Sequence, residues 1–532
     1  MKKINPLITF AIISFLFLLT FINFSNRMNS SNNLFYSDDL IPDKDNLNVS
    51  EISDIIHVNN NWTSAKMAGI CTGSGTFSDP YLIENLEINT EDSGTCILIE
   101  NSAVYFKIEN CTLNSGDSYP NAGIRLNNVT QGILRKNNCS FCYMGIWLSH
   151  CNNITISENI ANHSRYGIYL SHGNDCNISG NSAYSSYFSG IELLSSYNAT
   201  ITENIMNNSG LILSGGIEQL SSYDIDTTNI VNGNPLYFYK NEVDLGPDDF
   251  LDAGQIILVN CNDSIISNMD IRFSSSAISL HYCKNNTIAE NTISQNRIGI
   301  QLLGCHNTTL TKNNMSNNYI GLDLESCSNN NITENTANNN SYYGIALGSC
   351  NDNVILENVA NENNYYGVYL EISYNTTVSR NIANNNSFYG IYLHDSDSNI
   401  ISGNIVNDNS LYGIYLFFGY TNIISSNIAK YNSYHGIYLL GGEHNAITGN
   451  TANYNSIYGI ELFQSNYNTI SGNTLIGNGE CIHEDSCTGN IFSDNGGCTY
   501  GQIPIGLIIL ISVLSGGVIG IVIFLLIRRK NR

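Results

Sequence analysis

The sequence predicts an all-β fold, in which the chain winds as a single-stranded parallel β-helix of about 18 coils. Two markers that recur every 22 or 23 residues support this prediction. One is the glycine of short segments such as Gly-Ile-Tyr-Leu (413–416), and the other is an asparagine that follows a short strand rich in Ile, Thr and Ser. Because both markers keep the same period in phase, the chain contains a true internal repeat.

The two markers occupy most of the central chain. The glycines are Gly123, Gly145, Gly167, Gly190, Gly299, Gly321, Gly344, Gly367, Gly390, Gly413, Gly436 and Gly459. The asparagines are Asn159, Asn181, Asn204, Asn268, Asn291, Asn313, Asn335, Asn358, Asn381, Asn404, Asn427, Asn450 and Asn473. Segments such as Asn-Ile-Thr-Ile alternate with the period of two that is typical of strands. The lack of an amphipathic helix between them favours a β-helix over a leucine-rich repeat.

The repeat also predicts the arrangement inside each coil. Equivalent residues of neighbouring coils should lie about 4.8 Å apart, the spacing of paired strands, so the coils would form a rod of roughly 85 Å. In each Gly-Ile-x-Leu segment the Ile and Leu are expected to point inward and the residue between them outward. We expect the marker asparagine to turn inward at a corner and to hydrogen bond with the asparagines above and below it.

Apolar segments at both ends predict export and membrane attachment. Residues 1–25 begin with lysines and continue with an apolar run, which indicates a signal peptide or an uncleaved anchor. Residues 26–65 read as a polar leader and residues 66–500 as the β-helix. Residues 503–527 are uncharged and predict a transmembrane helix, whose basic tail (528–532) would be cytoplasmic. The β-helix is therefore expected outside the cell, on a single-pass protein of the cell membrane.

The net charge and the N-glycosylation triplets indicate which partners and modifications to expect. Only 12% of residues are charged, yet the net charge is -24. Such a surface repels phosphate backbones, so no nucleic-acid partner is expected. Many triplets, such as Asn110-Cys111-Thr112, match the N-glycosylation signal, which predicts a glycoprotein if the chain is exported.

The outward position of the Gly-Ile-x-Leu segment carries the main candidate binding residues. It is aromatic in four consecutive coils, at Tyr369, Tyr392, Tyr415 and Tyr438. Sugar rings stack on aromatic faces and hydrogen bond with phenol hydroxyls, so this stripe is a candidate binding surface for an extracellular or cell-surface polysaccharide. The alternative is that the tyrosines only stabilise the sheet through cross-strand ladders.

Acidic residues at the same outward position are too far apart to form a catalytic pair. Glu192, Asp323 and Glu461 are several coils apart along the repeat. Cleavage of a glycosidic bond needs two carboxylates within roughly 5–9.5 Å of each other. These three positions therefore do not predict a catalytic pair.

The repeat is interrupted at about residues 232–252, where a loop is expected to protrude. This loop carries four carboxylates, on Asp244, Asp248, Asp249 and Asp252. They could bind Ca²⁺, the one cofactor that the sequence suggests, or simply form a solvated acidic loop. Arg272 or Arg297, near the loop, is a weaker candidate for the base of a lyase.

The 15 cysteines are an odd number, so at least one is free or pairs with another chain. Five recur with the repeat and predict an inward stack of small apolar thiols, with disulfides between coils as the alternative: Cys261, Cys283, Cys305, Cys327 and Cys350. The cysteines near the ends of the solenoid are disulfide candidates that would close those ends outside the cell: Cys481, Cys487, Cys498, and Cys71 with Cys96.

Three segments carry a resemblance to a known family. They are the repeat unit NNITENTANNNSYYGIALGSC (330–350), the entry segment GSGTFSDPYLIENLEI (73–88) and the interruption at 231–268. Together they resemble the NosD-like branch of the right-handed parallel β-helix superfamily, which shares the pectin-lyase fold. The resemblance implies a right-handed coil over about residues 66–500. The superfamily includes polysaccharide lyases, hydrolases, epimerases, copper-maturation proteins and non-enzymatic surface proteins, so the resemblance leaves the activity open.

The sequence departs from the catalytic members of that superfamily. It has no Gly-His-Gly motif, no compact pair of aspartates on a repeat strand, and no cluster of His or Met. We therefore expect a membrane-tethered surface rod that binds a glycan or another cell-surface partner without being an enzyme. The alternatives are a lyase, hydrolase or epimerase that acts on acidic polysaccharides near the interruption, and a NosD-type periplasmic protein that matures a copper site.

Overall fold

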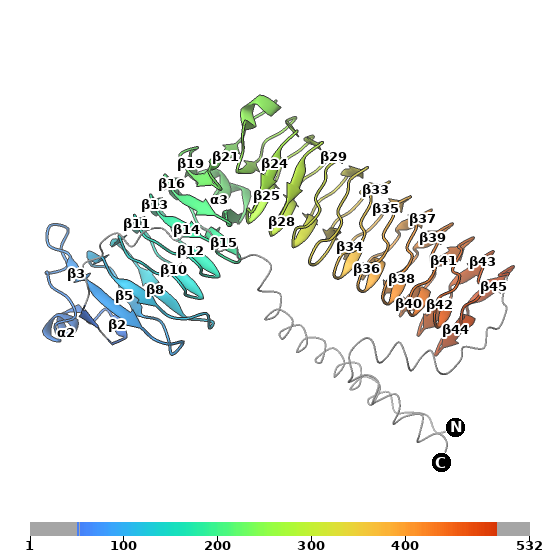
Figure 1. The fold of residues 1–532 in the computed structure, drawn as a ribbon, viewed down its shortest axis with the longest axis horizontal. Coiled ribbons are helices and arrows are strands. Elements are labelled where there is room, and N and C mark those ends of the chain that lie inside the picture. The colour runs from blue at the N-terminus through green and yellow to red at the C-terminus, as the bar shows by residue number, and fades with distance from the viewer. Residues whose placement is uncertain (1–50, 53, 497–532) are drawn as a thin grey trace, which may run out of the picture. The chain divides into compact units, whose positions relative to one another are not determined.

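The computed structural model, which describes residues 51–52 and 54–496, consists almost entirely of short strands paired in parallel, as Figure 1 shows. This confirms the predicted all-β parallel solenoid. The predicted signal segment (1–25), transmembrane segment (503–527) and basic tail (528–532) lie outside the described residues. Within the part of the chain that is described, no helix is long and apolar enough to span a membrane.

The Gly-Ile-x-Leu segments of the first coils form a seven-stranded sheet. Its strands are β2 (Ile56–Asn59), β5 (Ile97–Ser102), β8 (Ala122–Val129), β10 (Met144–Ser149), β12 (Tyr166–Ser171), β15 (Ser189–Leu194) and β18 (Leu211–Ser214). A second seven-stranded sheet covers the other side of the same coils. It contains β3 (Tyr81–Glu84), β6 (Phe106–Glu109), β9 (Gly132–Arg135), β11 (Thr155–Ser157), β13 (Asn177–Ser179), β16 (Thr200–Thr202) and β19 (Asp224–Ile225).

The later coils continue in a 15-stranded sheet, which we call the long sheet. It contains β14 (Ser182–Tyr184), β17 (Ile205–Asn207), β20 (Ile230–Val231), β21 (Asn234–Lys240), β22 (Gln255–Val259), β25 (Ser276–His281), β28 (Ile298–Leu303), β30 (Ile320–Glu325), β32 (Ile345–Gly348), β34 (Tyr366–Glu371), β36 (Tyr389–His394), β38 (Tyr412–Phe417), β40 (His435–Leu440), β42 (Tyr458–Phe463) and β44 (Glu480–Asp485).

An 11-stranded sheet lies on the other side of the later coils. It contains β23 (Ile265–Ser267), β26 (Thr287–Ala289), β29 (Thr309–Thr311), β31 (Asn331–Thr333), β33 (Val354–Leu356), β35 (Thr377–Ser379), β37 (Ile400–Ser402), β39 (Ile423–Ser425), β41 (Ala446–Thr448), β43 (Thr469–Ser471) and β45 (Ile491–Ser493). Two small sheets complete the coils: β1 (Glu51–Ile52) with β4 (Leu86–Asn89) and β7 (Thr112–Asn114), and β24 (Asp270–Arg272) with β27 (Thr292–Ser294).

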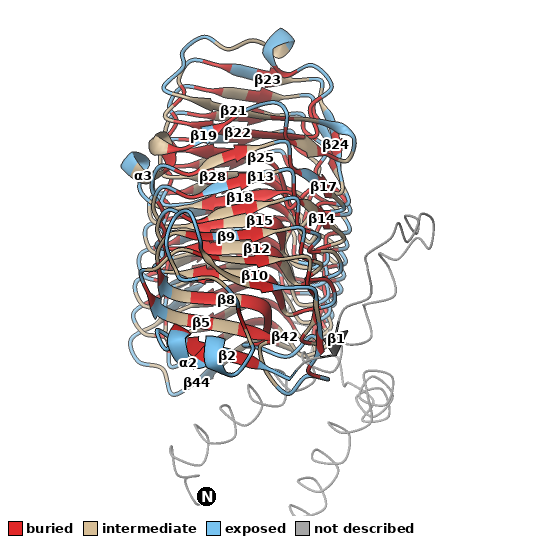
Figure 2. Cartoon of the chain, turned by 90° about the vertical axis from the view of Figure 1, so that its left-hand side faces the viewer, coloured by how far each residue is buried: buried red, intermediate tan, exposed pale blue. Residues whose placement is uncertain are grey.

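Alternation within each strand buries the apolar residues, which recur at the same positions from coil to coil (Figure 2). Ile414 and Leu416 of β38 are fully buried, as predicted for the Gly-Ile-x-Leu segment. The glycine before them is required by close packing. A Cβ on Gly413 would lie 2.6 Å from the carbonyl oxygen of Gly436 and 2.9 Å from Nδ2 of Asn432.

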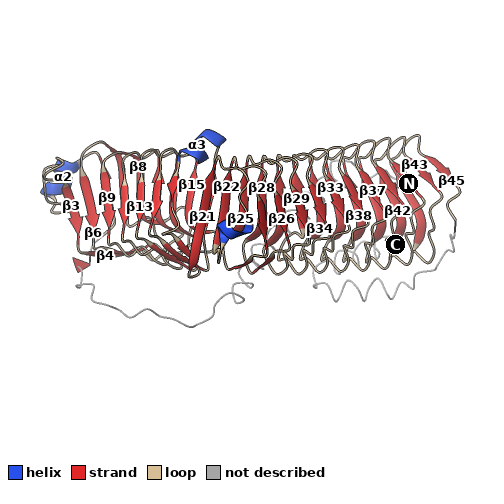
Figure 3. Cartoon of the chain, turned by 90° about the horizontal axis from the view of Figure 1, so that it is seen from above, coloured by secondary structure: helices blue, strands red, loops and turns tan. Residues whose placement is uncertain are grey.

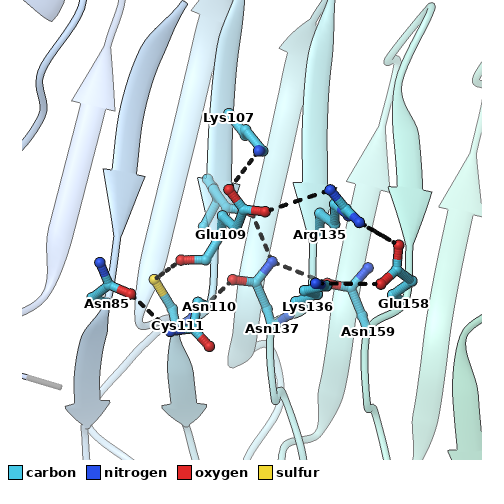
Figure 4. A network of polar contacts seen from close by, with 11 residues as sticks. Asn85, Lys107, Glu109, Asn110, Cys111, Arg135, Lys136, Asn137, Glu158 and Asn159 are labelled. Carbon is cyan, nitrogen blue, oxygen red and sulfur yellow. Dashed lines mark hydrogen bonds and ion pairs between the residues drawn. The ribbon is translucent and has the colours of Figure 1, made fainter. Parts of the chain in front are cut away.

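The predicted asparagine ladders are confirmed. Oδ1 of Asn159 accepts hydrogen bonds from the backbone N–H of Asn137 (2.9 Å) and from its Nδ2 (3.0 Å), as Figure 4 shows. A second ladder repeats this arrangement from Asn291 to Asn495. Asn268 was predicted to belong to it, but this residue is exposed and has a positive φ of 61°. Met269 occupies the ladder position instead, and its backbone N–H donates to Asn291.

The solenoid begins before residue 66, the boundary predicted from the sequence. Strand β2 lies in the expected polar leader, and its Ile56 and Val58 are buried in the first coil. Helix α2 (Trp62–Met67) follows it beside β3 (Figure 3). Trp62 stacks on Tyr81 with ring centroids 4.9 Å apart, so this short helix covers apolar residues at the end of the stack.

The interruption joins two separate cores. The first core extends from Ile56 to Val259 and the second from Phe250 to Cys481. Strand β22 belongs to both, because Ile256 and Leu258 point into the second core while Ile257 and Val259 point into the first. The all-apolar run in this strand is therefore a wall shared by the two cores.

At this join, a side-chain amide of β22 forms the hydrogen bonds with the backbone of β18. The Gln255 amide is fully buried, accepts from the Leu211 N–H (2.9 Å) and donates to the Leu211 carbonyl (2.7 Å). The predicted protruding loop is also partly ordered into the sheet, since β21 pairs antiparallel with β20 and parallel with β22. The rest includes the short helix η2 (Pro247–Phe250), while α3 (Ile217–Ser222) precedes the join.

Candidate functional site

The four predicted tyrosines lie on the outer face of the long sheet, where they stack on one another. Ring centroids are 5.2 Å apart for Tyr369 and Tyr392, 4.9 Å for Tyr392 and Tyr415, and 5.0 Å for Tyr415 and Tyr438. The planes of the last two pairs differ by 6° and 5°. The strand spacing of about 4.8 Å places equivalent rings at a stacking distance, so the rings lie face to face along the solenoid.

A second aromatic column packs beside the first. It occupies the position before the glycine, at Tyr343, Tyr366, Tyr389, Tyr412, His435 and Tyr458. Rings of the two columns meet at steep angles, as for Tyr389 and Tyr415, whose centroids are 5.0 Å apart with planes at 61°. Tyr415 is consequently only 8% exposed.

This packing corrects the expectation that the ring faces are open to sugars. The faces of Tyr392 and Tyr415 are covered by the neighbouring rings of the same column, which leaves ring edges and hydroxyls as the parts that can reach a ligand. Burial raises the pKa of these phenols and of Tyr438 above the ordinary value, so they remain hydrogen-bond donors. Glycan binding by the four tyrosines remains a prediction.

The aromatic columns end at a pocket, which we call the notch. In strand β32 the two outward positions are small, Ala346 and Gly348. The coil before them presents Asp323 and Glu325 at these positions, and the coil after them presents Tyr369 and Glu371. The missing side chains leave a pocket of about 340 Å³, lined by Ile320, Asp323, Glu325, Tyr343, Ala346, Leu347, Gly348, Tyr369 and Glu371. This volume lies at the lower end of the range of ligand pockets.

Three carboxylates face the notch. Burial raises the pKa of Asp323 from its ordinary 3.8 to about 6, and the nearby Glu325 acts in the same direction. Gln301 opposes this shift through a long hydrogen bond from Nε2 to Oδ2 of Asp323 (3.4 Å). Glu325 leans toward Gly348, because a Cβ on that glycine would lie 2.3 Å from Oε2 of Glu325. Glu371 lies 3.7 Å from Nδ1 of His394.

Sequence reasoning missed this grouping. The outward position of the Gly-Ile-x-Leu segment, taken alone, predicts that Asp323 is an isolated acid. The next outward position of the same strands supplies Glu325 and Glu371. The available signal was that a single coil has small residues at both outward positions, Ala346 and Gly348, between coils that have large ones.

The four aspartates of the interruption, which are candidates for Ca²⁺ binding or for a solvated acidic loop, do not form a cluster. Asp249 uses its Oδ2 to accept the backbone N–H of Gly246 (2.7 Å), while Asp244, Asp248 and Asp252 are exposed. No group of three or more His, Cys, Asp or Glu in the described part of the chain could hold a metal ion.

The acidic segment also packs away from the aromatic columns. The hydroxyl of Tyr237 donates to the carbonyl of Leu251 (2.9 Å), and the hydroxyl of Tyr239 to that of Asp249 (3.2 Å). Both tyrosines belong to β21, six strands before β34 in the long sheet. The two candidate lyase bases lie elsewhere: Arg272 pairs with Asp270 (2.8 Å), and Arg297 lies over the ring of Phe188 (4.9 Å).

The cysteine column is confirmed as an inward stack of buried free thiols. Each sulfur after that of Cys261 accepts the backbone N–H of the cysteine one coil earlier, at 3.4 Å for Cys261 to Cys283 and 3.3 Å for Cys327 to Cys350. The predicted disulfide between Cys71 and Cys96 is wrong, because both are buried free thiols and Cys96 donates to the carbonyl of Ile88.

The C-terminal cysteines differ from one another. Cys487 is also free, and its sulfur accepts the backbone N–H of Ser465 (3.3 Å). Its predicted role in a disulfide is therefore wrong. Cys481 is disulfide-bonded, as predicted, whereas Cys498 lies outside the described residues.

Known proteins share only limited similarity with this chain. A comparison with curated protein sequences finds no match. Solved structures similar to this chain include the periplasmic alginate epimerase AlgG, with 13% identity over 84% of this chain and 85% of that chain and a TM-score of 0.30. Others are the A-module of the mannuronan C-5 epimerase AlgE6 of Azotobacter vinelandii (14%, 75% and 90%, TM-score 0.24) and the Dettilon tailspike protein (13%, 75% and 62%, TM-score 0.26).

Family models match most of the solenoid. The model of the periplasmic copper-binding protein NosD matches residues 227–388. The model of the right-handed beta helix region matches residues 95–243 and 357–497, together more than half of the chain. With the parallel coils described above, these matches show that the chain is a NosD-like member of the right-handed parallel β-helix family.

Proposed function

We propose that this protein is an extracytoplasmic, membrane-tethered β-helix that binds a polysaccharide on the outer face of its long sheet without cleaving it. The notch carries this proposal, because it is a ligand-sized pocket that opens in a row of tyrosine edges and hydroxyls. The tethering and the location outside the cell rest on the predicted segments 1–25 and 503–527.

A repetitive surface can recognise a repetitive ligand through hydrogen-bonding groups that recur at a fixed spacing. Phenol hydroxyls both donate and accept hydrogen bonds, as sugar hydroxyls do. The stacked rings hold these hydroxyls at the coil spacing, so they are pre-organised and lose little side-chain entropy on binding. The notch then supplies a concave position where one sugar unit can be buried next to Tyr343 and Tyr369.

The test is a glycan array with the full-length protein and a variant that fills the notch. Ala346→Tyr introduces the residue found at the same position in the next four coils and should extend the tyrosine stack into the pocket. Ala446→Tyr, at a partly exposed position of β41 on the other sheet, is the matched control. We expect binding by the wild type and the control and loss in Ala346→Tyr. Equal binding by all three, or none by the wild type, would refute the proposal.

A second candidate function is hydrolysis of a glycosidic bond in the notch. The observation in its favour is the raised pKa of Asp323, which suits a general acid, together with Glu371 two coils away. Two strand spacings across the sheet and two residues along the strand separate their backbones by about 12 Å, so the side chains must lean toward each other to reach the roughly 6.5–9.5 Å between the carboxylates of inverting enzymes. This function predicts release of reducing ends, lost in both Asp323→Asn and Glu371→Gln, whereas pure binding predicts no release.

A metal-handling role rests on the resemblance and on the NosD match at 227–388. It remains a prediction. Metal analysis of the full-length protein purified without a histidine tag would test it directly.

A further inference from the structure

We propose that the notch selects the ammonium group of an amino sugar, that is, an unacetylated 2-amino-2-deoxyhexose unit of a polysaccharide. This inference rests on the proposed function and names the ligand class of the same site. Acidic sugars, sulfated sugars and N-acetylated sugars are then weaker ligands.

Charge is the first observation. Three carboxylates line the notch, on Asp323, Glu325 and Glu371, and none of the lining residues is basic. The protein as a whole carries a net charge of -24, which adds to the negative potential. A sugar carboxylate or sulfate in this pocket would face repulsion from all three groups, whereas an ammonium group would be attracted.

The lack of cationic partners is the second observation. Several acids elsewhere on the solenoid are paired with a basic group: Glu109 with Lys107, Glu158 with Arg135 (2.8 Å; Figure 4), and Glu461 with His435 (2.7 Å). The partly buried Glu192 has no ion pair within the described residues but accepts a hydrogen bond from the Ser189 hydroxyl (3.0 Å). None of the ion pairs in the described part of the chain includes Asp323 or Glu325.

Of the two carboxylates of the notch without an ion pair, Asp323 is the more buried. Surrounding protein removes most of its contact with water, and its one hydrogen bond, from Gln301, is long. The nearest basic influence is Arg297, which lies over Phe188 and does not line the pocket. A buried acid without a cationic partner is costly, and a bound ammonium group would compensate it.

The third observation is that two aromatic rings, those of Tyr343 and Tyr369, line the notch. Tyr369 is the first ring of its column, because the preceding coil has Ala346 at this position. One face of Tyr369 is therefore not covered by a ring of its own column, and this residue lines the notch. Tyr343 lies beside it, with ring centroids 5.1 Å apart and planes at 40°. Aromatic faces attract cations and pack against the apolar side of sugar rings.

The size of the notch favours an amino sugar over a bare metal ion as its ligand. The notch has a volume of about 340 Å³. Its carboxylates do not form a group that could hold a metal ion. Carboxylates that surround a space the size of a sugar ring can instead bind an ammonium group carried on a sugar. Each carboxylate then forms a charge-assisted hydrogen bond with the ammonium group or attracts it from a longer distance.

The test is calorimetric titration of the full-length protein with two tetramers of equal length, one of glucosamine and one of N-acetylglucosamine. We expect the glucosamine tetramer to bind about tenfold or more tightly, because its ammonium groups meet unpaired carboxylates. Asp323→Asn and Glu371→Gln should each weaken its binding about three- to tenfold. Asp352→Asn, which removes an exposed charge from a neighbouring turn, is the control and should leave binding unchanged.

Ala346→Tyr distinguishes the outcomes, since it fills the notch and keeps all three carboxylates. Loss of glucosamine binding in this variant, with an unchanged unfolding temperature, supports the inference. Unchanged binding would overturn it, because the tetramer would then be attracted by the negative surface alone. Equal binding of both tetramers, lost in Ala346→Tyr, overturns the amino-sugar inference but keeps the proposed function. Binding of no glycan overturns both, and equally tight binding of a lysine tetramer overturns selectivity for a sugar.

Discussion

The unpaired acid of the notch leads to a stability prediction that does not depend on any ligand. Asp323→Asn should stabilise the protein at neutral pH. The folded protein holds the proton of Asp323 up to about pH 6, whereas an unfolded chain releases it near the ordinary value of 3.8. Between these pH values the folded state binds more protons than the unfolded state, so the free energy of unfolding falls as the pH rises. Above about pH 6 the whole penalty is present.

The size of the effect follows from the pKa difference. At 1.36 kcal/mol per pKa unit the shift corresponds to about 3 kcal/mol as an upper limit. Because the carboxylate reaches water through the notch, we expect a gain of about 1–3 kcal/mol for the asparagine variant. Asparagine has nearly the same shape, carries no charge and can still accept the hydrogen bond from Gln301.

The assay is urea unfolding followed by circular dichroism, at neutral pH and near pH 3. The variant should be more stable than the wild type at neutral pH, and the difference should shrink toward zero near pH 3, below the ordinary value of 3.8, where the wild-type side chain is mostly protonated in both states. Asp352→Asn serves as the control and should show no gain. A loss of stability at neutral pH, or a gain that is the same at both pH values, would refute the reasoning.

Three further predictions concern the architecture. Gly413→Ala should destabilise the protein by about 1–3 kcal/mol through overcrowding, while Gly246→Ala, which has no atom within 4 Å of the added Cβ, should not, as measured by thermal unfolding. Asn404→Ala should cost about 2–4 kcal/mol in urea unfolding, because it removes the buried oxygen that accepts the backbone N–H of Asn381, whereas Asn268→Gly, at an exposed position with a positive φ, should be nearly neutral. In the native protein Cys487 should react first with a thiol reagent, since the other free thiols of the described chain are buried; equal labelling of several thiols would contradict this.

The period of the sequence was sufficient to predict the coils. A repeat of 22 or 23 residues fixes which residues are stacked, so the inward Ile and Leu, the asparagine ladders and the cysteine column followed from spacing alone. Where the sequence leaves the repeat, this reasoning failed. The marker at Asn268 was one residue out of register, because nothing in the local pattern showed that Met269 replaces an asparagine. The early start at β2 was missed because the first coil lacks the markers.

The surface was harder to predict than the core. Spacing placed Tyr392 and Tyr415 in one column but could not show whether their faces point to solvent or to each other, since that depends on the rotamer and on the neighbouring column. The notch was missed for a related reason. It is formed by residues that are small, Ala346 and Gly348, and a search for reactive side chains passes over them.

The strand shared by the two cores has a sequence typical of burial on both faces. Gln255 to Val259 is continuously apolar after its first residue, but it lies in the interruption, where the repeat gives no register. The apolar run alone does not show that its two faces belong to different cores.

The most direct test of the central claim is a crystal structure of the full-length protein with the glycan oligomer that binds most tightly. We predict one sugar unit in the notch, against Tyr343 and Tyr369, with its nitrogen within hydrogen-bonding distance of at least one of Asp323, Glu325 and Glu371. A glycan bound elsewhere, with the notch empty at saturating ligand, would contradict it.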